Sequence, residues 1–470
     1  MKLISNRKTR FMKSLYILLF FSLTSCLLQA QSNQYFTDAT YKFNFSTDFE
    51  PNTHISATNQ SIQLTYSAQP VLSQKIPIPL QDAEPFITAA IQYDGPSNEQ
   101  LLEQFAIRFS EDGQNWEDWV LVYEDMHIPD ESRLSSFTGQ LIFAQATNKY
   151  FQLAIYPKAN KTIEFDLIQV VFSAPGKSKE IVLTTPPLIN NRAVCPQPSV
   201  QWRADWCSLG ECPYGSNPAY TTVTHLIVHH SAGSNTSTDW AATVRAIWHY
   251  HVDTKGWNDI GYNWLIDPNG VLYEGRPDNV RGAHFSGHNT GTLGVCILGN
   301  FHNANPKASP KAPAIEKLER LLCWKSEKEN LNPLATKYHA SSGLNLKVIA
   351  GHRDSGSGTA CPGDSLYIQL PAIRIYVDSL LHPLSIFSPV KNSGLLTITP
   401  TLSQNNIQIK YATPYHPKLT YQIISPSGKK IQNTDFQEDV SLNIANLPNG
   451  IYFIRIIGKD VMDIFRIIKN

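Results

Sequence analysis

The sequence predicts a multidomain fold, with a central α/β mixed sheet flanked by helices, an N-terminal all-β sandwich and a C-terminal small β-sandwich. The first observation is the length, because 470 residues exceed what a single hydrophobic core usually organises. The second is that short apolar segments separated by turn residues fill residues 31–175 and recur in residues 386–470. The third is that strands alternate with amphipathic helices between these regions, which is typical of a sheet covered by helices.

Charge and composition exclude one class of partner. The chain has 39 Lys and Arg residues and 39 Asp and Glu residues, so its formal net charge is zero. Proteins that bind nucleic acid normally carry a basic surface, and we therefore expect no nucleic-acid partner. The aromatic residues (9 Trp, 20 Tyr and 21 Phe) suit carbohydrate contacts and ordinary hydrophobic cores equally well.

Residues 1–30 have the pattern of a signal peptide. A basic start precedes the apolar run Leu15–Phe21, and Ala30 ends a small-residue cleavage site. The segment Leu23–Cys26 also resembles a lipoprotein processing box, which would leave a lipid on Cys26. Hydrophobic residues continue past Cys26, and this favours plain cleavage after Ala30. No later stretch has the roughly 20 apolar residues of a membrane span, so we expect no transmembrane segment.

Six of the seven cysteines follow the predicted cleavage site. Cys207 and Cys212 are five residues apart in a loop-like stretch, and an exported chain meets an oxidising compartment. We therefore predict that these two cysteines form a disulfide. Cys296 lies in an apolar run and is predicted to be a buried thiol, whereas Cys323 lies within a helical pattern.

Residues 31–175 are predicted to be all-β, because turn residues separate apolar segments at intervals of about ten residues, as in a sandwich or jelly roll. The turn Ser110–Trp116 resembles turns of unrelated sandwiches and assigns no function. We interpret this region as a spacer or an accessory binding module. The predicted strands are Tyr41–Phe45, Ser61–Tyr66, Phe86–Tyr93, Phe105–Phe109, Trp119–Tyr123, Gly139–Ala144, Tyr150–Tyr156 and Thr162–Phe172.

Residues 176–200 are rich in proline and polar residues, as linkers are, and strands mixed with helices follow. Polar cap residues before Thr238–Val252 and Gly256 after it predict an amphipathic helix. The turn Asp267–Gly270 predicts a hairpin between Tyr262–Ile266 and Val271–Glu274. The other predicted elements are the strands Thr224–His230, Leu293–Leu298 and Lys347–Ala350, and the helices Ala314–Lys328 and Asp364–Leu381, the last one interrupted at Pro371.

His229, His352 and Cys361, with Tyr262 between the first two, are the most informative residues. Two imidazoles and a thiolate are ligands of a catalytic zinc, which takes three protein donors and keeps a fourth position for water. Zinc would activate that water, and Tyr262 could donate a hydrogen bond to an oxyanion. Because side chains alternate along a strand, only one of His229 and His230 can face the metal, and the sequence does not choose between them. On spacing alone, structural histidines explain the pattern equally well.

Several segments occur in an order that resembles a known family. They are Val228–Gly233, Asp259–Asn263, Tyr273–Arg276, Arg281–His284, Gly291–Val295, Gly351–Asp354 and Cys361–Gly363. Residues 201–382 thereby resemble the peptidoglycan recognition protein and type-2 N-acetylmuramoyl-L-alanine amidase family. The resemblance implies that His229, His352 and Cys361 bind zinc and that Tyr262 is catalytic. The implied reaction is hydrolysis of the amide between N-acetylmuramic acid and L-alanine in peptidoglycan. The alternative is a non-catalytic peptidoglycan-binding recognition protein, as relatives without the cysteine are.

The chain departs from the family pattern in three places. Thr359 stands where phage members carry a catalytic lysine; threonine is common in the recognition-protein branch, so we keep Thr359 as a catalytic-site residue and exclude a lysine-assisted mechanism. The loop from His352 to Cys361 is one residue longer than in many relatives. Pro277–Asp278 replaces the Gly-Trp pair by which animal relatives favour diaminopimelate stems, so the stem preference stays open.

Four further residues border the expected groove. His284 and His288 are predicted to be hydrogen-bonding histidines and not zinc ligands, because three donors suffice. His284 could bind substrate or orient a carbonyl. Arg276 and Arg353 could pair with stem-peptide carboxylates, although surface ion pairs explain them equally well.

The C-terminal region resembles the sorting domain of type IX secretion. The resemblance rests on Ile424–Lys429, Leu447–Tyr452 and the closing segment Phe465–Asn470. It implies the type IX secretion machinery as a partner and a location outside the cell or on its surface. The alternative is an immunoglobulin-like wall-binding module. The predicted strands are Leu396–Thr399, Ile407–Tyr411, Thr420–Ile424, Val440–Ile444 and Ile451–Ile457.

Together these observations predict an exported zinc amidase whose partner is peptidoglycan. The expected parts are a signal peptide (1–30), an accessory sandwich (31–175), a linker (176–200), a zinc amidase domain (201–385) and a linker with the sorting domain (386–470). The remaining alternative is a structural surface protein with a vestigial amidase domain and an adhesive N-terminal sandwich.

Overall fold

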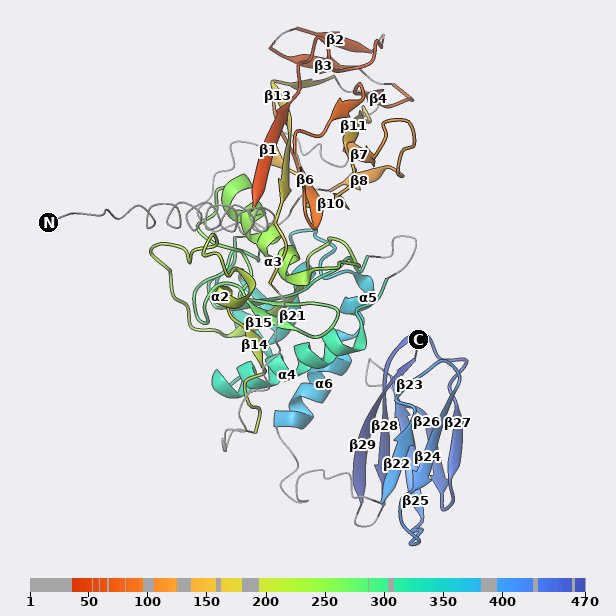
Figure 1. Ribbon diagram of the computed structural model, residues 1–470. Coiled ribbons are helices and arrows are strands. Elements are labelled where there is room, and N and C mark those ends of the chain that lie inside the picture. Colours follow the sequence, from red (N-terminus) through yellow and green to blue (C-terminus); the bar gives the residue numbers. More distant parts are fainter. Residues whose placement is uncertain are drawn as a thin grey trace, which may run out of the picture. The chain divides into compact units, whose positions relative to one another are not determined.

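The computed structural model (Figure 1) describes residues 36–469 except for 53, 59, 66, 81, 96–104, 124, 126–136, 158–161, 180–193, 286, 303–307, 382–394, 426–429, 459 and 460. The predicted signal peptide, Cys26 and most of both predicted linkers lie outside the described residues. Contacts divide the chain into two units. The first is Met1–Tyr123, Phe143–Ile181 and Ala241–Ala246, and the second is Glu124–Ile142, Val182–Trp240 and Ile247–Asn470.

The N-terminal region is built from β-sheets, as predicted. One five-stranded sheet contains β1 (Thr37–Lys42), β13 (Leu167–Ala174), β6 (Phe86–Asp94), β10 (Ile142–Gln145) and β9 (Phe137–Thr138). A second contains β4 (Val71–Leu72), β11 (Tyr150–Ile155), β7 (Phe105–Ser110), β8 (Val120–Val122) and β5 (Ile76–Pro77). Phe151 of β11 packs edge-on against Phe172 of β13, with ring centroids 4.9 Å apart, so aromatic side chains join the two sheets.

The single strand predicted over Thr162–Phe172 is wrong. The segment forms two strands, β12 (Ile163–Phe165) and β13, which belong to different sheets. Strand β12 pairs with β3 (Ile62–Leu64), which also pairs with β2 (Ile55–Ala57). Between β12 and β13 the backbone N–H of Asp166 donates to the carbonyl oxygen of Asp94. The change of partner depends on distant strands, which a local pattern does not reveal.

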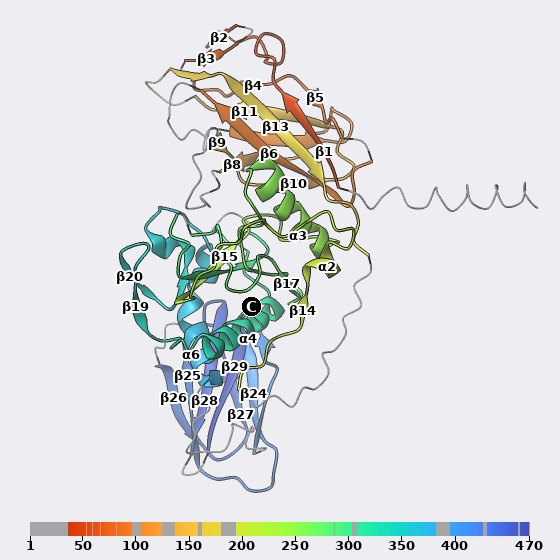
Figure 2. The same cartoon turned by 90° about the vertical axis from the view of Figure 1, so that its left-hand side faces the viewer.

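A six-stranded mixed sheet organises the central region. Its order is β14 (Val200–Gln201), β17 (Leu272–Glu274), β16 (Trp264–Ile266), β18 (Thr292–Ile297), β15 (His225–His230) and β21 (Ile349–Gly351). Helices α4 (Ala312–Lys328) and α6 (Leu370–Leu381) lie together on one side of this sheet, as Figures 1 and 2 show, and α3 (Trp240–His249) follows β15 along the chain. The shorter elements are α2 (Arg203–Trp206), α5 (Asp364–Tyr367) and the hairpin β19 (Thr336–His339) and β20 (Leu344–Lys347).

Two predicted helices differ in detail from the observed ones. The helix predicted over Thr238–Val252 is α3, followed by a π-helix, η2 (Tyr250–Thr254). The helix predicted over Asp364–Leu381 consists of α5 and α6, and the break lies before Pro371 instead of at it. Pro371 occupies the first turn of α6, where its missing N–H costs no intrahelical hydrogen bond.

The predicted hairpin between β16 and β17 is confirmed. The carboxylate of Asp267 accepts hydrogen bonds from the backbone N–H groups of Asn269 and Val271, at 2.8 and 2.9 Å. Gly270 has a positive φ of 80°, which a side chain would strain, and its N–H donates to the carbonyl of Asp267. The turn therefore fixes the register of the hairpin.

The structure pairs four of the cysteines. Cys207 is bonded to Cys212, as predicted, and Cys195 is bonded to Cys323 across a sequence separation of 128 residues. The second pair was not predicted, because the two residues become neighbours only in the fold. Cys296 and Cys361 are free and buried.

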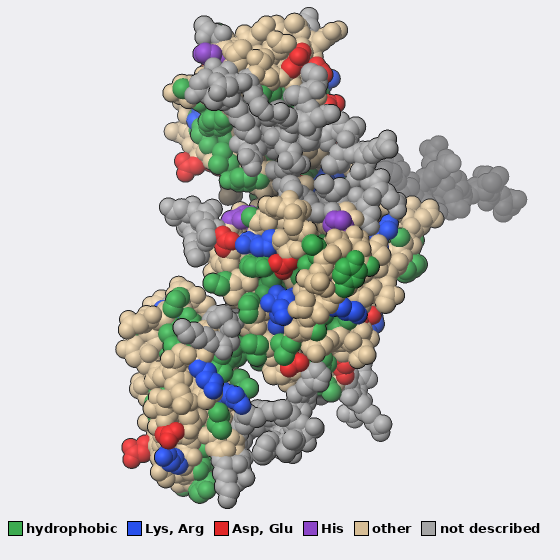
Figure 3. Space-filling view, turned by 180° about the vertical axis from the view of Figure 1, so that it is seen from behind, with side chains coloured by type: hydrophobic (Ala, Val, Ile, Leu, Met, Phe, Trp, Pro, Cys, Tyr) green, Lys and Arg blue, Asp and Glu red, His purple; other side chains and the backbone are tan. Residues whose placement is uncertain are grey.

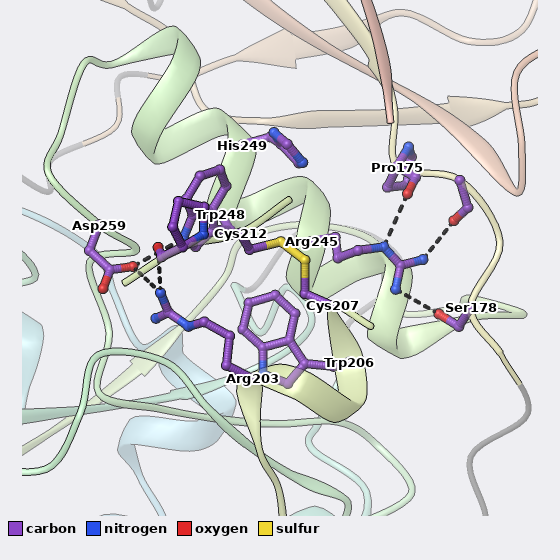
Figure 4. Close-up of a disulfide and its surroundings, with 12 residues drawn as sticks. Pro175, Ser178, Arg203, Trp206, Cys207, Cys212, Arg245, Trp248, His249 and Asp259 are labelled. Atoms are coloured by element: carbon purple, nitrogen blue, oxygen red, sulfur yellow. Dashed lines mark hydrogen bonds and ion pairs between the residues drawn. A yellow bond between two sulfur atoms is a disulfide. The ribbon is translucent and has the colours of Figure 1, made fainter. Parts of the chain in front are cut away.

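Arg245 of α3 belongs to the first unit through its contacts. Its buried guanidinium donates to the carbonyl oxygens of Pro175 and Gly176, at 3.1 and 2.7 Å, and to the hydroxyl of Ser178, at 3.0 Å (Figure 4). The first residues of the predicted linker 176–200 are therefore held by hydrogen bonds.

The C-terminal region contains two sheets that share a hydrophobic core. One consists of β22 (Leu396–Thr399), β24 (Asn406–Tyr411) and β27 (Val440–Asn443). The other consists of β23 (Leu402–Ser403), β29 (Met462–Lys469), β28 (Gly450–Ile457), β25 (Leu419–Ile424) and β26 (Lys430–Phe436). The prediction missed the short strand β23 and also β26, whose residues before Phe436 are exposed and polar for the most part.

The described surface agrees with the balanced charge of the sequence. On the face that Figure 3 shows, acidic and basic side chains are interspersed. None of the helices in the described part of the chain combines the length and the apolar character that a membrane span requires.

Candidate active site

Two neighbouring parallel strands bring His229 and His352 together. Strands β15 and β21 pair in parallel, with Val228 opposite Gly351, so His229 and His352, which follow these two residues, lie at the same end of the sheet. Carboxyl ends of parallel strands are where sites in such sheets form. The two imidazole centroids lie 4.8 Å apart, and both side chains are fully buried.

Cys361 reaches the same place through a loop that folds back. Its Sγ lies 3.6 Å from Nδ1 of His229 and accepts a hydrogen bond from the backbone N–H of His230, at 3.4 Å. The N–H of Arg353 donates to the carbonyl of Cys361, at 2.8 Å. The hydroxyl of Thr359 accepts from the N–H of Cys361, at 3.2 Å, which places Thr359 in the turn that presents the thiol.

The geometry of His229, His352 and Cys361 fits a zinc ion. One donor atom of each residue lies within 4.8 Å of the donor atoms of the other two. Tetrahedral zinc with bonds of about 2.0 Å to nitrogen and about 2.3 Å to sulfur separates these two ligand atoms by roughly 3.5 Å, close to the observed 3.6 Å. Burial raises the pKa of the Cys361 thiol to about 12, so a cation is needed to favour the thiolate.

The structure distinguishes the two adjacent histidines. His229 lies on the face of β15 opposite to the core residues Leu226 and Val228 and points to Cys361. His230 points to the other side, where its Nδ1 accepts a hydrogen bond from the N–H of Phe301, at 3.1 Å. His229 is therefore the candidate ligand of the pair.

A chain of hydrogen bonds leads away from His229. Its Nε2 lies 2.9 Å from Nδ1 of His284, and Nε2 of His284 lies 3.3 Å from the hydroxyl of Thr292. That hydroxyl donates to the carbonyl of Asn289, at 2.8 Å. With Nδ1 of His229 facing the thiol, the network assigns a proton to Nε2 of both histidines. Hydrogen bonds of this kind fix the orientation and tautomer of a metal-binding histidine.

His284 is fully buried, and two glycines make room for its ring. A Cβ atom added to Gly282 would lie 2.3 Å from Cδ2 of His284, and one added to Gly294 would lie 2.5 Å from the same atom. Neither distance is tolerable between non-bonded carbon atoms. The glycines of the Arg-Gly-Ala-His and Leu-Gly-Val segments therefore allow the imidazole to reach His229.

Tyr262 lies beside the candidate ligand His229. Its ring centroid is 5.4 Å from that of His229, and its side chain is buried. Burial, with the nearby Cys296 and other groups, raises the pKa of Tyr262 well above its usual value. The hydroxyl therefore stays protonated and keeps a proton to donate.

The two arginines predicted to bind substrate contact the protein itself. The guanidinium of Arg276 donates to the carbonyl oxygens of Ile260 and Arg281, each at 2.7 Å, and of Asp259, at 3.3 Å. Arg276 thus holds the segment before Tyr262. Arg353 forms an ion pair of 2.7 Å with Asp364 and donates to the carbonyl of Ala360, next to Cys361.

Comparison with known proteins identifies the family. Residues 219–364 match the family model of N-acetylmuramoyl-L-alanine amidase. Peptidoglycan-recognition protein SC2 of Drosophila melanogaster is 35% identical over 150 residues, which cover 32% of this chain and 72% of that protein. The chain belongs to the peptidoglycan recognition protein and N-acetylmuramoyl-L-alanine amidase family. Residues 398–470 match a secretion-system C-terminal sorting domain.

Other members of the family are similar over the same part. Peptidoglycan recognition protein 1 of Bos indicus is 37% identical over 174 residues, covering 36% of this chain and 80% of that protein. N-acetylmuramoyl-L-alanine amidase of Homo sapiens is 34% identical over 167 residues, covering 34% of this chain and 26% of that protein. The crystal structure of Drosophila peptidoglycan recognition protein SD is 26% identical, with a TM-score of 0.29, covering 36% of this chain and 92% of that one.

The prediction missed two residues of the hydrogen-bond network around His284, namely Thr292 and Asn289. Thr292 lies in the recognised segment Gly291–Val295, and its strand β18 runs beside β15 with Cys296 opposite His229. Strand alternation places Thr292 on the same face as Cys296, which is a signal that the sequence contains. Asn289, whose side-chain oxygen accepts from the N–H groups of His284 and Phe285, has no comparable local signal.

Proposed function

We propose that this chain is a zinc-dependent N-acetylmuramoyl-L-alanine amidase that hydrolyses the amide between N-acetylmuramic acid and L-alanine in peptidoglycan. The observation that carries the proposal is the convergence of His229, His352 and Cys361, whose donor atoms lie within 4.8 Å of one another. Family members that bind without cleaving need no such set. The family itself supports peptidoglycan as the substrate class.

Each side chain has a proposed role. His229, His352 and Cys361 would hold zinc, which when bound supplies a polarising charge and an activated water. Tyr262 donates a hydrogen bond to the carbonyl oxygen of the scissile amide as that oxygen gains negative charge. His284 orients His229 instead of binding substrate, because the side chain of His284 is fully buried and hydrogen-bonded to His229.

The loop residues act by shaping the site. We assign Arg276 and Arg353 to holding the loops of Tyr262 and Cys361, since their guanidinium groups donate to nearby backbone carbonyls. Thr359 supports the turn before Cys361 through its hydroxyl. Contacts of these three residues with the stem peptide are not needed to explain their positions.

We also propose a three-part organisation with export to the cell surface or the medium. The sorting domain at residues 398–470 supports passage through a type IX secretion system, preceded by removal of residues 1–30 as a signal peptide. The amidase domain spans residues 201–385, between the linkers 176–200 and 386–397. The N-terminal sandwich is an accessory module.

The decisive experiment combines metal analysis with a digest of peptidoglycan. The purified chain is expected to contain one zinc per molecule and to release peptides that begin with a free L-alanine amino group, detected by mass spectrometry of the muropeptides. A zinc-free protein that binds peptidoglycan and leaves it intact would instead be a recognition protein.

A matched pair of cysteine variants tests the ligand assignment. Cys361→Ser should lose both zinc and activity, because a hydroxyl is a poor replacement for the thiolate. Cys296→Ser, at the second free and buried cysteine among the described residues, should keep its zinc. Full zinc occupancy with normal turnover in Cys361→Ser would refute the assignment.

A further inference from the structure

A short segment before the family-matched residues 219–364 forms hydrogen bonds and an ion pair with loops near the candidate site. We call residues 202–216 the brace segment. It begins with α2 and is closed on itself by the disulfide between Cys207 and Cys212. Figure 4 shows this disulfide beside Trp206, with Arg203 extending from α2 toward Asp259.

Arg203 is the central residue of the brace segment. Its buried guanidinium forms an ion pair of 2.9 Å with Asp259, and the two side chains are only 4% and 5% exposed. The same guanidinium donates to the carbonyl oxygens of Pro213, at 2.9 Å, and of Gly275. It also packs over the ring of Tyr214, 4.2 Å from the centroid. The planar guanidinium thus joins the brace segment to the loops that contain Asp259 and Gly275. A lysine, with a single ammonium group, cannot reproduce this geometry.

The carboxylate of Asp259 accepts hydrogen bonds from several separate parts of the chain. Besides Arg203, its carboxylate accepts hydrogen bonds from the indole of Trp248, at 3.0 Å, from the N–H of Ile260, at 2.7 Å, and from the N–H of Gly215, at 3.2 Å. Figure 4 shows Arg203 and Trp248 converging on this carboxylate. The position of Asp259 is therefore determined by the brace segment on one side and by α3 on the other.

Asp259 lies three residues before Tyr262, and the intervening backbone is fixed as well. The carbonyl of Ile260 accepts from Arg276, and the N–H of Gly261 donates to Nδ1 of His251, at 3.1 Å. The carbonyl of Tyr262 accepts from the N–H of Arg276, at 2.8 Å. We expect a shift at Asp259 to be transmitted along this short, hydrogen-bonded stretch to the phenol.

We propose that Arg203, held by the Cys207–Cys212 disulfide, is a positioning residue that sets the location of the Tyr262 hydroxyl. The disulfide joins the residue after α2 to the residue before Pro213, so it fixes both the helix that carries Arg203 and one of its acceptors. This inference rests on the proposed amidase function. It adds a dependence on oxidation, because the chain without this disulfide keeps its zinc ligands and loses the support of Tyr262.

The first test compares Arg203→Lys with the wild type in zinc content, kcat and KM. Lysine keeps the positive charge but lacks the planar set of N–H donors of the guanidinium. A displacement of about 1 Å costs up to about 100-fold in rate, so we expect kcat to fall by roughly 10- to 100-fold with one zinc retained and KM changed little. The paired variant Cys207→Ser with Cys212→Ser should show the same pattern. Cys195→Ser with Cys323→Ser, which breaks the other disulfide, should leave kcat unchanged.

A double-variant cycle separates positioning from general damage to the fold. In a Tyr262→Phe background no hydroxyl remains to be placed, so adding Arg203→Lys should lower kcat less than twofold. An equal loss in both backgrounds would overturn the proposal, and so would a fully active Arg203→Lys. If Arg203→Lys does not fold, the Cys207 and Cys212 pair is used in the same cycle. A wild-type protein without amidase activity would contradict the proposed function instead.

Discussion

At the scale of single residues, the buried chain from His229 through His284 and Thr292 to the carbonyl of Asn289 is the main feature of the site. Each polar atom along it has a partner, at distances from 2.8 to 3.3 Å. A buried network that is fully satisfied fixes one arrangement, whereas an interrupted one is costly. The chain therefore holds His229 in the ring orientation that faces Cys361.

Removing His284 should weaken metal binding without removing a ligand. Hydrogen-bond partners of metal ligands typically contribute about 10- to 100-fold to metal affinity, and we expect a loss of this size in His284→Ala. The measurement is the zinc dissociation constant by competition with a chelator. His288→Ala, at a partly exposed histidine of the same segment, is the control and should bind zinc normally.

Gly294→Ala provides an independent check on the same ring. The added Cβ would displace His284 and should weaken zinc binding in the wild-type background. In His284→Ala the space is free, so the second substitution should have little effect. Equal effects in both backgrounds would contradict the role of His284.

Replacing Tyr262 should affect catalysis and leave the metal in place. Tyr262→Phe removes the only proton that this side chain can donate, and loss of one oxyanion donor typically slows turnover by about 100-fold or more. The protein should retain one zinc. Steady-state kinetics and metal analysis of the same preparation measure kcat and zinc content together. Unchanged kinetics would show that Tyr262 takes no part in the mechanism.

The residue types of the site could be predicted from sequence, but their contacts could not. The resemblance to the amidase family implied that His229, His352 and Cys361 bind zinc, and the structure brings the three side chains together. Arg276 and Arg353 looked equally suited to substrate or to ion pairs, because a sequence does not show which carbonyl oxygens are near. Thr292 and Asn289 acquire their roles only when β18 lies beside β15.

At the scale of elements, local patterns located most strands and helices, and long-range pairing decided the remainder. Strand β15 and the hairpin of β16 and β17 were predicted within a residue or two, since their turn and periodicity signals are local. Strands β12 and β13 were merged because only their partners, β3 and β6, distinguish them. The same limit applies to His229 and His230, since the packing of Leu226 and Val228 into the core decides which face of β15 carries the site.

The first residue of β15, His225, should make the free energy of unfolding depend on pH. Burial lowers the pKa of His225 to about 4, and its Nε2 lies 3.2 Å from the carbonyl of Lys337. The unfolded chain, with a pKa near 6.5, then binds this proton more readily than the folded chain. Stability should therefore fall as the pH decreases from about 6.5 to about 4, by at most about 1.4 kcal/mol per pH unit.

Urea denaturation of the metal-free protein between pH 7.5 and 4 tests this dependence. Metal-free protein is used so that ligand histidines do not add zinc release to the result. His225→Gln, which keeps a donor for the carbonyl of Lys337, should show a flatter profile than the wild type. Parallel profiles would show that His225 does not contribute.

At the scale of the whole molecule, the contact units do not follow the boundaries predicted from composition. The described residues Asp125 and 137–142 belong to a region that was assigned to the N-terminal sandwich, yet contacts group them with the second unit. Asp125 explains this, because its carboxylate accepts from Lys255, at 2.8 Å, and from the hydroxyl of Tyr250, at 3.1 Å. Boundaries predicted from composition follow changes in residue content along the chain. Contacts depend on individual buried side chains such as Asp125, so the two can differ.

The sorting domain should be required for export and dispensable for the reaction. A chain that ends at residue 393 is expected to remain inside the envelope of a bacterium with a type IX system, while its purified form keeps amidase activity. Immunoblots of medium, cell surface and periplasm measure the distribution. Full-length Cys361→Ser is the control, since it should be exported although inactive. Normal export of the shortened chain would contradict the prediction.

The bond between Cys195 and Cys323 has a consequence for survival outside the cell. It links the segment that precedes the amidase domain to α4, and the enclosed stretch contains His229 and Tyr262, while His352 and Cys361 follow it. If a foreign protease cuts one peptide bond anywhere inside this stretch, the two fragments remain covalently attached. The three proposed zinc ligands then stay on one covalently linked molecule, and we expect the nicked protein to keep the arrangement of its site.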